Sequence, residues 1–250
     1  MQRHDDNPPG AQIASLAPLQ RAALAAAGGG VIVGAASLAL ARAPLPALTA
    51  AAFFGTVALV ALGFFAQLRP RPPFGAANAI TLCRAALIAV VAGYAVDPPP
   101  AEDNDWWIAA LLAGATLLLD GADGWTARRR GLATAFGARF DMETDALAAL
   151  VLSLALWRAD RTGAWIVAVG ALRYFFLIAG WAFAAMRWPL PPSQRRRIVA
   201  ALQAALLTIC LVPVLPVWAA PVLGGGALAM TALSFLIDTY WLLRRHGIRA

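Results

Sequence analysis

Eight apolar runs dominate the chain, and each approaches the length of a membrane-spanning helix. They cover approximately residues 22–42, 48–67, 76–96, 106–127, 142–157, 163–186, 198–218 and 221–243. A span needs about 20 apolar residues, because the hydrocarbon core is about 30 Å thick and a helix rises about 1.5 Å per residue. The fifth run reaches that length if its helix starts near Gly137. The runs therefore predict an all-α, polytopic membrane bundle, and no separate soluble domain fits beside it.

The composition supports the same conclusion. Hydrophobic residues make up 61% of the chain and charged residues 13%, against about 45–50% and about 25% in soluble domains. The net charge of +7 comes from 20 arginines, since the chain has no lysine. In a membrane protein, excess arginine marks cytoplasmic loops and attracts anionic headgroups. We therefore expect membrane lipids, and no nucleic acid, among the partners.

The arginines also predict the orientation of the chain. With the N-terminus inside, the outer side carries only Arg42, Arg158 and Arg161, whereas fifteen arginines lie in inner segments. The acidic loop 97–105 then lies outside, and Trp106 and Trp107 begin the next span as interface anchors. We expect a multi-pass protein of a bacterial inner membrane, with segment 120–145 on the cytoplasmic side.

Four aspartates in segment 120–145 predict a metal site. Asp120 and Asp123 are spaced i, i+3, and Asp141 and Asp145 are spaced i, i+4, so each pair shares one face of its helix. Four clustered carboxylates repel one another unless protons or cations neutralise them. Oxygen ligands alone favour Mg²⁺ or Mn²⁺, and two such ions suit displacement at phosphorus. The prediction fails if the carboxylates are scattered, face lipid, or are paired with guanidinium groups that leave no gap for cations.

This segment resembles the signature of a known family. The string Asp120-x2-Asp123-Gly124-x2-Ala127-Arg128-x8-Gly137-x3-Asp141-x3-Asp145 matches the motif DxxDGxxARx8GxxxDxxxD of the CDP-alcohol phosphatidyltransferases at every defined position. The resemblance covers about residues 74–243 and implies a six-helix core. The chain would then divide into a membrane domain at 74–250 and an N-terminal region at 1–73, made of a cytoplasmic tail and two additional transmembrane helices.

The resemblance also implies a reaction. Enzymes of this family move a phosphatidyl group from CDP-diacylglycerol to the hydroxyl of an alcohol acceptor and release CMP, in phospholipid biosynthesis. Asp120 and Asp141 would bridge two Mg²⁺ or Mn²⁺ ions, Asp123 would complete the first ion and Asp145 the second. Asp145 would also accept the proton of the attacking hydroxyl. The family is often dimeric, so the resemblance allows a homodimer.

Further residues follow from the same resemblance. Those that would bind the CDP-lipid are Asn78, Thr81, Arg84, Gly124, Ala127, Arg128, Thr134 and Gly137. The first three form an NxxTxxR pattern on the first core helix. Because an arginine inside a span costs at least about 2.5–3.5 kcal/mol on insertion scales, we expect Arg84 and Arg173 to face a cavity or a charged partner.

The acceptor is less defined. Relatives that use phosphorylated acceptors carry basic residues at places comparable to Arg173, Arg195, Arg196 and Arg197, which slightly favours glycerol 3-phosphate or inositol phosphate. Serine, choline, a second lipid and other polyols stay open, and each clustered arginine could equally reach lipid headgroups. We expect Asp238, late in the last span, to pair with the nearby Arg244 and Arg245.

Two other functions are alternatives. An intramembrane, Mg²⁺-dependent prenyltransferase also uses aspartates on helices, but its two motifs lie far apart in the sequence. A transporter would place acids near the bilayer midplane on discontinuous helices. In this chain, all four acids lie within one helix-loop-helix segment.

Overall fold

The computed structural model describes residues 9–40, 44–70, 72, 74–99, 104–130 and 134–246, without the side chains of residues 9–16, 38–40, 122–130 and 246. Within these residues the chain is all α-helical, with no strand. The eight α-helices are α1 (Pro9–Leu40), α2 (Pro44–Gln67), α3 (Ala76–Val96), α4 (Asp105–Arg130), α5 (Ala135–Arg158), α6 (Val167–Ala182), α7 (Gln194–Cys210) and α8 (Ala219–His246). Short 3₁₀ helices, η1 (Ala164–Ile166) and η2 (Ala184–Arg187), flank α6. The predicted all-α membrane bundle is confirmed.

Five of the helices are long and apolar enough to cross a membrane, and they cover Ala17–Ser37, Pro44–Gln67, Ala76–Val96, Ala164–Ala182 and Ala219–Arg245 among the described residues. Helix α5 carries several charged residues in its first half, including Asp141, Glu143 and Asp145, and α7 is only 17 residues long.

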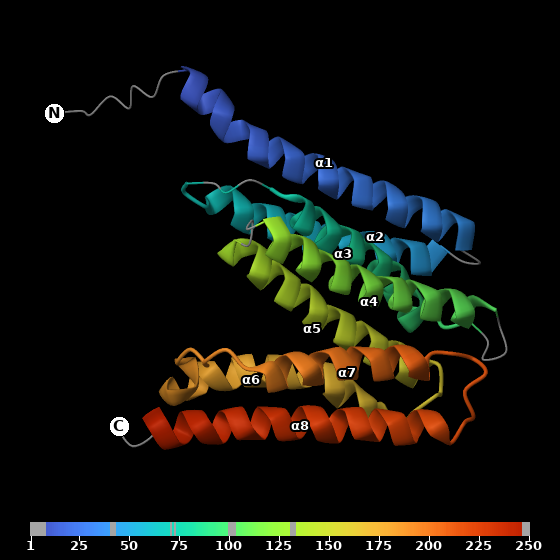
Figure 1. Cartoon of the computed structure of the whole chain (residues 1–250). Helices are drawn as coiled ribbons and strands as arrows, with labels where there is room; N and C mark the ends of the chain where they lie inside the picture. The colour runs from blue at the N-terminus through green and yellow to red at the C-terminus, as the bar shows by residue number, and fades with distance from the viewer. Residues whose placement is uncertain are drawn as a thin grey trace.

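Helix α3 is the centre of the N-terminal half of the bundle. It packs against α1, α2, α4 and α5, and small side chains such as Ala86 and Ala89, both fully buried, allow these helices to approach closely. A buried cluster joins α1 and α2 to α3 and to Phe140 of α5. A second cluster extends from α3 through α4 and α5 to α7 and α8. Figure 1 shows α1 at one edge of the bundle and α8 at the other.

Helix α5 connects the two halves, and its crossing with α6 is close. A Cβ added at Gly170 of α6 would lie 2.3 Å from the Cα of Leu150 in α5, so only glycine fits there. The C-terminal end of α4 and the N-terminal end of α5 lie at the same end of the bundle as the C-terminal end of α8 (Figure 1). This arrangement brings residues 120–130 and 134–145 toward the same end of the molecule.

Two predicted details are wrong. The seventh run was expected to continue to residue 218, but α7 ends at Cys210. Pro213 and Pro216 follow closely, and proline cannot continue the helical hydrogen-bond pattern.

Trp106 was expected to be an interface anchor, but it is 3% exposed and its Nε1 donates a hydrogen bond to the carbonyl of Pro99 at 3.3 Å. Trp107 is the exposed member of the pair.

Candidate metal and phosphate site

Three of the four predicted aspartates come together between α4 and α5. Asp120 lies in the C-terminal half of α4, and Asp141 and Asp145 lie one turn apart in the N-terminal half of α5. One carboxylate oxygen from each residue lies within 4.8 Å of the others. The side chain of Asp123 lies outside the described residues. Helices α4 and α5 both pack against α3, and this shared neighbour brings the three acids into one cluster.

A guanidinium group from a third helix meets all three carboxylates. The Nη1 atom of Arg84, on α3, lies 3.0 Å from Oδ1 of Asp120 and also donates to Oδ1 of Asp141. The Nη2 atom donates to Oδ1 of Asp145. Arg84 is only 2% exposed, so these pairs supply the charged partner expected for an arginine inside a span.

Among the side chains that the structure describes, the cluster is not neutral after this pairing. Three carboxylates and one guanidinium carry a formal charge of −2. The aspartate side chains are 42%, 36% and 44% exposed, whereas Arg84 is buried. The carboxylates can therefore be reached from outside the protein while the guanidinium lies beneath them, and further cations are still attracted.

The start of α5 is held against α3 by a second set of polar residues. Thr134 caps the helix, because its Oγ1 accepts a hydrogen bond from the backbone N–H of Gly137 at 3.0 Å. A Cβ at Gly137 would come within 2.7 Å of Oδ1 of Asn78. Asn78, Thr81 and Arg84 recur at every third position of α3, and all three are buried. Five residues predicted to bind the CDP-lipid thus lie on α3 and the first turn of α5.

The remaining residues predicted to bind the CDP-lipid are Gly124, Ala127 and Arg128. Their backbones belong to α4. Their side chains lie outside the described residues.

Arg173 has an acidic partner that the sequence analysis missed. Its Nη2 donates to Oε1 of Glu143 at 2.7 Å, which joins α6 to α5. Glu143 lies two residues after Asp141, and two residues correspond to about 200° around a helix. Its carboxylate therefore points away from the aspartates, toward α6. An acid within a predicted span was itself a signal, because such a group needs a base nearby.

The basic segment at the start of α7 also has an acidic partner. Asp238 of α8 accepts from Nη2 of Arg195, and from Nη1 of Arg196 at 3.1 Å. Arg195 donates as well to the hydroxyl of Ser234 at 2.6 Å. Asp238 was expected to pair with Arg244 and Arg245, but the antiparallel packing of α7 on α8 brings the first turn of α7 to it instead. Arg197 is exposed.

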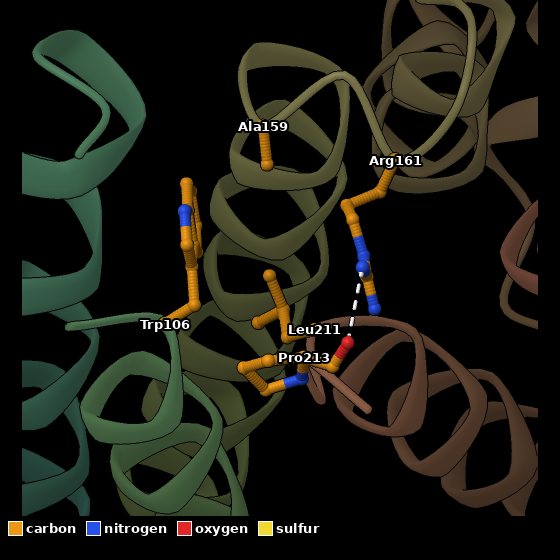
Figure 2. Close-up of a pocket in the computed structure, with 5 residues that line it drawn as sticks. All are labelled: Trp106, Ala159, Arg161, Leu211 and Pro213. Atoms are coloured by element: carbon orange, nitrogen blue, oxygen red, sulfur yellow. Dashed lines mark hydrogen bonds between the residues drawn. The ribbon is translucent and has the colours of Figure 1, made fainter. Parts of the chain in front are cut away.

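A small hollow lies at the far end of α5 from the aspartates. Figure 2 shows its lining residues, Trp106, Ala159, Arg161, Leu211 and Pro213, and the hydrogen bond from Arg161 to the carbonyl of Pro213. It has room for about one water molecule. Arg161 also donates to the carbonyl of Cys210 at 3.4 Å, so it satisfies carbonyl groups at the end of α7. Arg161 thus stabilises the end of α7, and the hollow beside it is too small for a substrate.

A comparison with protein-family models gives a match that includes this site. The family model described as CDP-alcohol phosphatidyltransferase matches residues 74–237. The match begins just before α3 and ends in α8, so it includes every helix that contributes to the aspartate cluster. Comparisons with curated proteins and with solved structures give no match.

Proposed function

Because the chain belongs to the CDP-alcohol phosphatidyltransferase family, we propose that it transfers the phosphatidyl group of CDP-diacylglycerol to the hydroxyl of an alcohol and releases CMP. The observation that carries the proposal is the convergence of Asp120, Asp141 and Asp145 from two helices within 4.8 Å. Few other uses explain three carboxylates in a bundle this apolar, because their mutual repulsion must be offset.

The described residues fit a divalent cation. Opposite ligands of an octahedral Mg²⁺ lie about 4 Å apart, twice the metal–oxygen distance, so oxygens spread over 4.8 Å need to close only slightly. The donors are all oxygens, which favours Mg²⁺ or Mn²⁺, and the guanidinium of Arg84 already lies there as a cation. Asp120, Asp141 and Asp145 would hold the ion, and Asp123 would supply the fourth carboxylate for a second ion.

The bound ions would stabilise negative charge on the phosphoryl oxygens and on the departing CMP phosphate. We assign Asp145 the role of general base for the acceptor hydroxyl. Its side chain is 44% exposed, so an acceptor can reach the carboxylate from outside the bundle, as proton transfer requires.

The donor would bind over the starts of α3 and α5. Asn78 is held against Gly137, and Thr134 caps α5, so these polar groups are already held on the helices that carry Arg84, Asp141 and Asp145. We include Thr81 and Arg84 from α3, and Gly124, Ala127 and Arg128 from α4, in the same donor site. Glycine and alanine leave room for a nucleotide to approach the backbone.

The acceptor would bind toward α6 and α7. Arg173 is paired with Glu143, whereas Arg195 and Arg196 share the single carboxylate of Asp238. The three arginines and two acids therefore keep one net positive charge, which a phosphorylated acceptor could meet. Arg197 completes the proposed set. We retain a phosphorylated polyol, such as glycerol 3-phosphate or inositol phosphate, as the favoured acceptor class.

The donor keeps two acyl chains in the bilayer while CMP leaves to water, so the site must lie at headgroup depth. The aspartates lie in the C-terminal half of α4 and the N-terminal half of α5, and these two halves lie toward one end of the bundle (Figure 1), which suits that depth. We place this end on the cytoplasmic side of a bacterial inner membrane, on the arginine distribution of the sequence.

The proposal is tested by incubating the purified protein with CDP-diacylglycerol, Mg²⁺ or Mn²⁺ and a panel of alcohols, while CMP release is measured. We expect release with at least one alcohol, and a loss of about 10²–10⁴-fold in Asp145→Asn. Asp97→Asn makes the same change at the C-terminal end of α3, outside the aspartate cluster, and is the matched control. Full turnover in Asp145→Asn would remove the base assignment. Release of pyrophosphate from a prenyl diphosphate, with no CMP release from CDP-diacylglycerol, would favour a prenyltransferase.

A further inference from the structure

Arg84 uses the same carboxylate oxygens that a metal ion would use. Its two terminal nitrogens contact Oδ1 of Asp120, Oδ1 of Asp141 and Oδ1 of Asp145. These are three of the six carboxylate oxygens in the cluster. A guanidinium group and a divalent cation cannot lie at the same place on one oxygen set, because both are positive and each needs direct contact with the lone pairs.

Arg84 contacts the carboxylates from the buried side of the cluster and so links three helices. The side chain is 2% exposed and reaches the carboxylates from α3, on the buried side of the cluster. It therefore joins α3 to α4 and α5 by charge-assisted hydrogen bonds, which are about twice as strong as neutral ones. The same contacts hold the three carboxylates close together despite their repulsion.

We propose that Arg84 is a positioning residue that assembles the three carboxylates and then competes with the divalent cation for them. This inference rests on the proposed metal-dependent function. The guanidinium acts as an internal counterion that a metal ion must displace from Oδ1 of each aspartate. Binding of the metal is consequently weaker than three such carboxylates would otherwise give, and loading the site moves the Arg84 head group away from α4 and α5.

The proposal predicts that loss of Arg84 increases the affinity for the divalent cation. A purely structural role for Arg84 predicts a decrease. A residue that only orients ligands strengthens metal binding, so its loss weakens binding. A competitor has the opposite effect, because its loss frees three oxygens and removes a like charge from the site. Arg84→Gln should therefore bind the cation more tightly, although the protein without the cation should be less stable.

The experiment measures Mn²⁺ binding to detergent-solubilised full-length protein by the loss of the free Mn²⁺ electron paramagnetic resonance signal. Thermal midpoints are recorded in EDTA and in Mn²⁺. Asp120→Asn defines the binding that belongs to this cluster. Arg158→Gln is the matched control, since Arg158 is exposed at the opposite end of α5 and bonds only to the carbonyl of Val96 among the contacts described.

We expect Arg84→Gln to bind Mn²⁺ at least about tenfold more tightly than the wild type, with a lower thermal midpoint in EDTA and a larger increase on adding Mn²⁺. Arg158→Gln should match the wild type in affinity. Arg84→Lys keeps the charge but has one nitrogen in place of the planar fork, so it should bind Mn²⁺ a few-fold more tightly. Arg84→Lys also tests the proposal if Arg84→Gln does not fold.

Two failures are distinguishable. If Mn²⁺ binds in an Asp120-dependent way but Arg84→Gln or folded Arg84→Lys binds it equally or less tightly, the competition is disproved while the proposed function stands. If wild type and every variant show no Asp120-dependent Mn²⁺ binding, the metal-dependent function fails together with the inference that rests on it.

Discussion

Gly137 lies so close to Asn78 that a Cβ on the glycine would stand 2.7 Å from the asparagine Oδ1. The contact holds the first turn of α5 against α3, one turn before Asp141. We expect Gly137→Ala to push the helices apart and to cost about 1–3 kcal/mol of unfolding free energy, with a loss of CMP release. Thermal unfolding and turnover check this. Gly114→Ala in α4, where a Cβ meets nothing within 4 Å, should leave both intact.

Metal removal should abolish activity. We expect EDTA to stop CMP release, and Mg²⁺ or Mn²⁺ to restore it, because three carboxylates with one guanidinium retain a formal charge of −2 and need more cations. Asp141→Asn should lower turnover by about 10²-fold or more, and added metal should not rescue it fully. Turnover that persists after dialysis against EDTA would contradict the prediction.

The pair Glu143–Arg173 offers a test of the acceptor class. Its 2.7 Å hydrogen bond compensates the charge of Arg173. Glu143→Gln should therefore lower the KM of a phosphorylated acceptor by about twofold to fivefold, the size of a partly exposed ion pair. Arg173→Gln should raise that KM. An unphosphorylated alcohol is the control substrate, and equal effects on both acceptors would place Arg173 outside the acceptor site.

Asp238 should contribute to the stability of the α7–α8 packing. Its side chain is 9% exposed and accepts hydrogen bonds from Arg195 and Arg196. We expect Asp238→Asn to lower the unfolding free energy by about 1–3 kcal/mol, because two guanidinium groups lose a charged acceptor. Denaturation in detergent measures this. Asp160→Asn is the control, since Asp160 is exposed and its φ of 53° is one that asparagine also adopts. An unchanged midpoint in Asp238→Asn would show that this ion pair is not stabilising.

Much of the fold could be predicted because the relevant signals are local. Long apolar runs and the spacing of Asp141 and Asp145 are properties of single helices, and α5 begins at Ala135, close to the predicted start. The predicted end of α7 was wrong because the apolar run continues past Cys210, whereas the helix does not. Beyond Cys210, Pro213 lies in the chain and Arg161 donates hydrogen bonds to backbone carbonyl groups. Hydropathy records composition and does not record which backbone groups find partners.

The sequence by itself determined an apolar all-α chain, the family, and four aspartates on two consecutive helices. Only the tertiary structure decided which positive charge meets which acid: Arg84 meets Asp141 and Asp145 across 57 and 61 residues, and Arg195 meets Asp238 across 43. Helical periodicity extends along one helix, so it places side chains on a face. The partner of that face depends on how the helices pack, and in this low-dielectric bundle each buried charge is stable only beside the group that the packing brings to it.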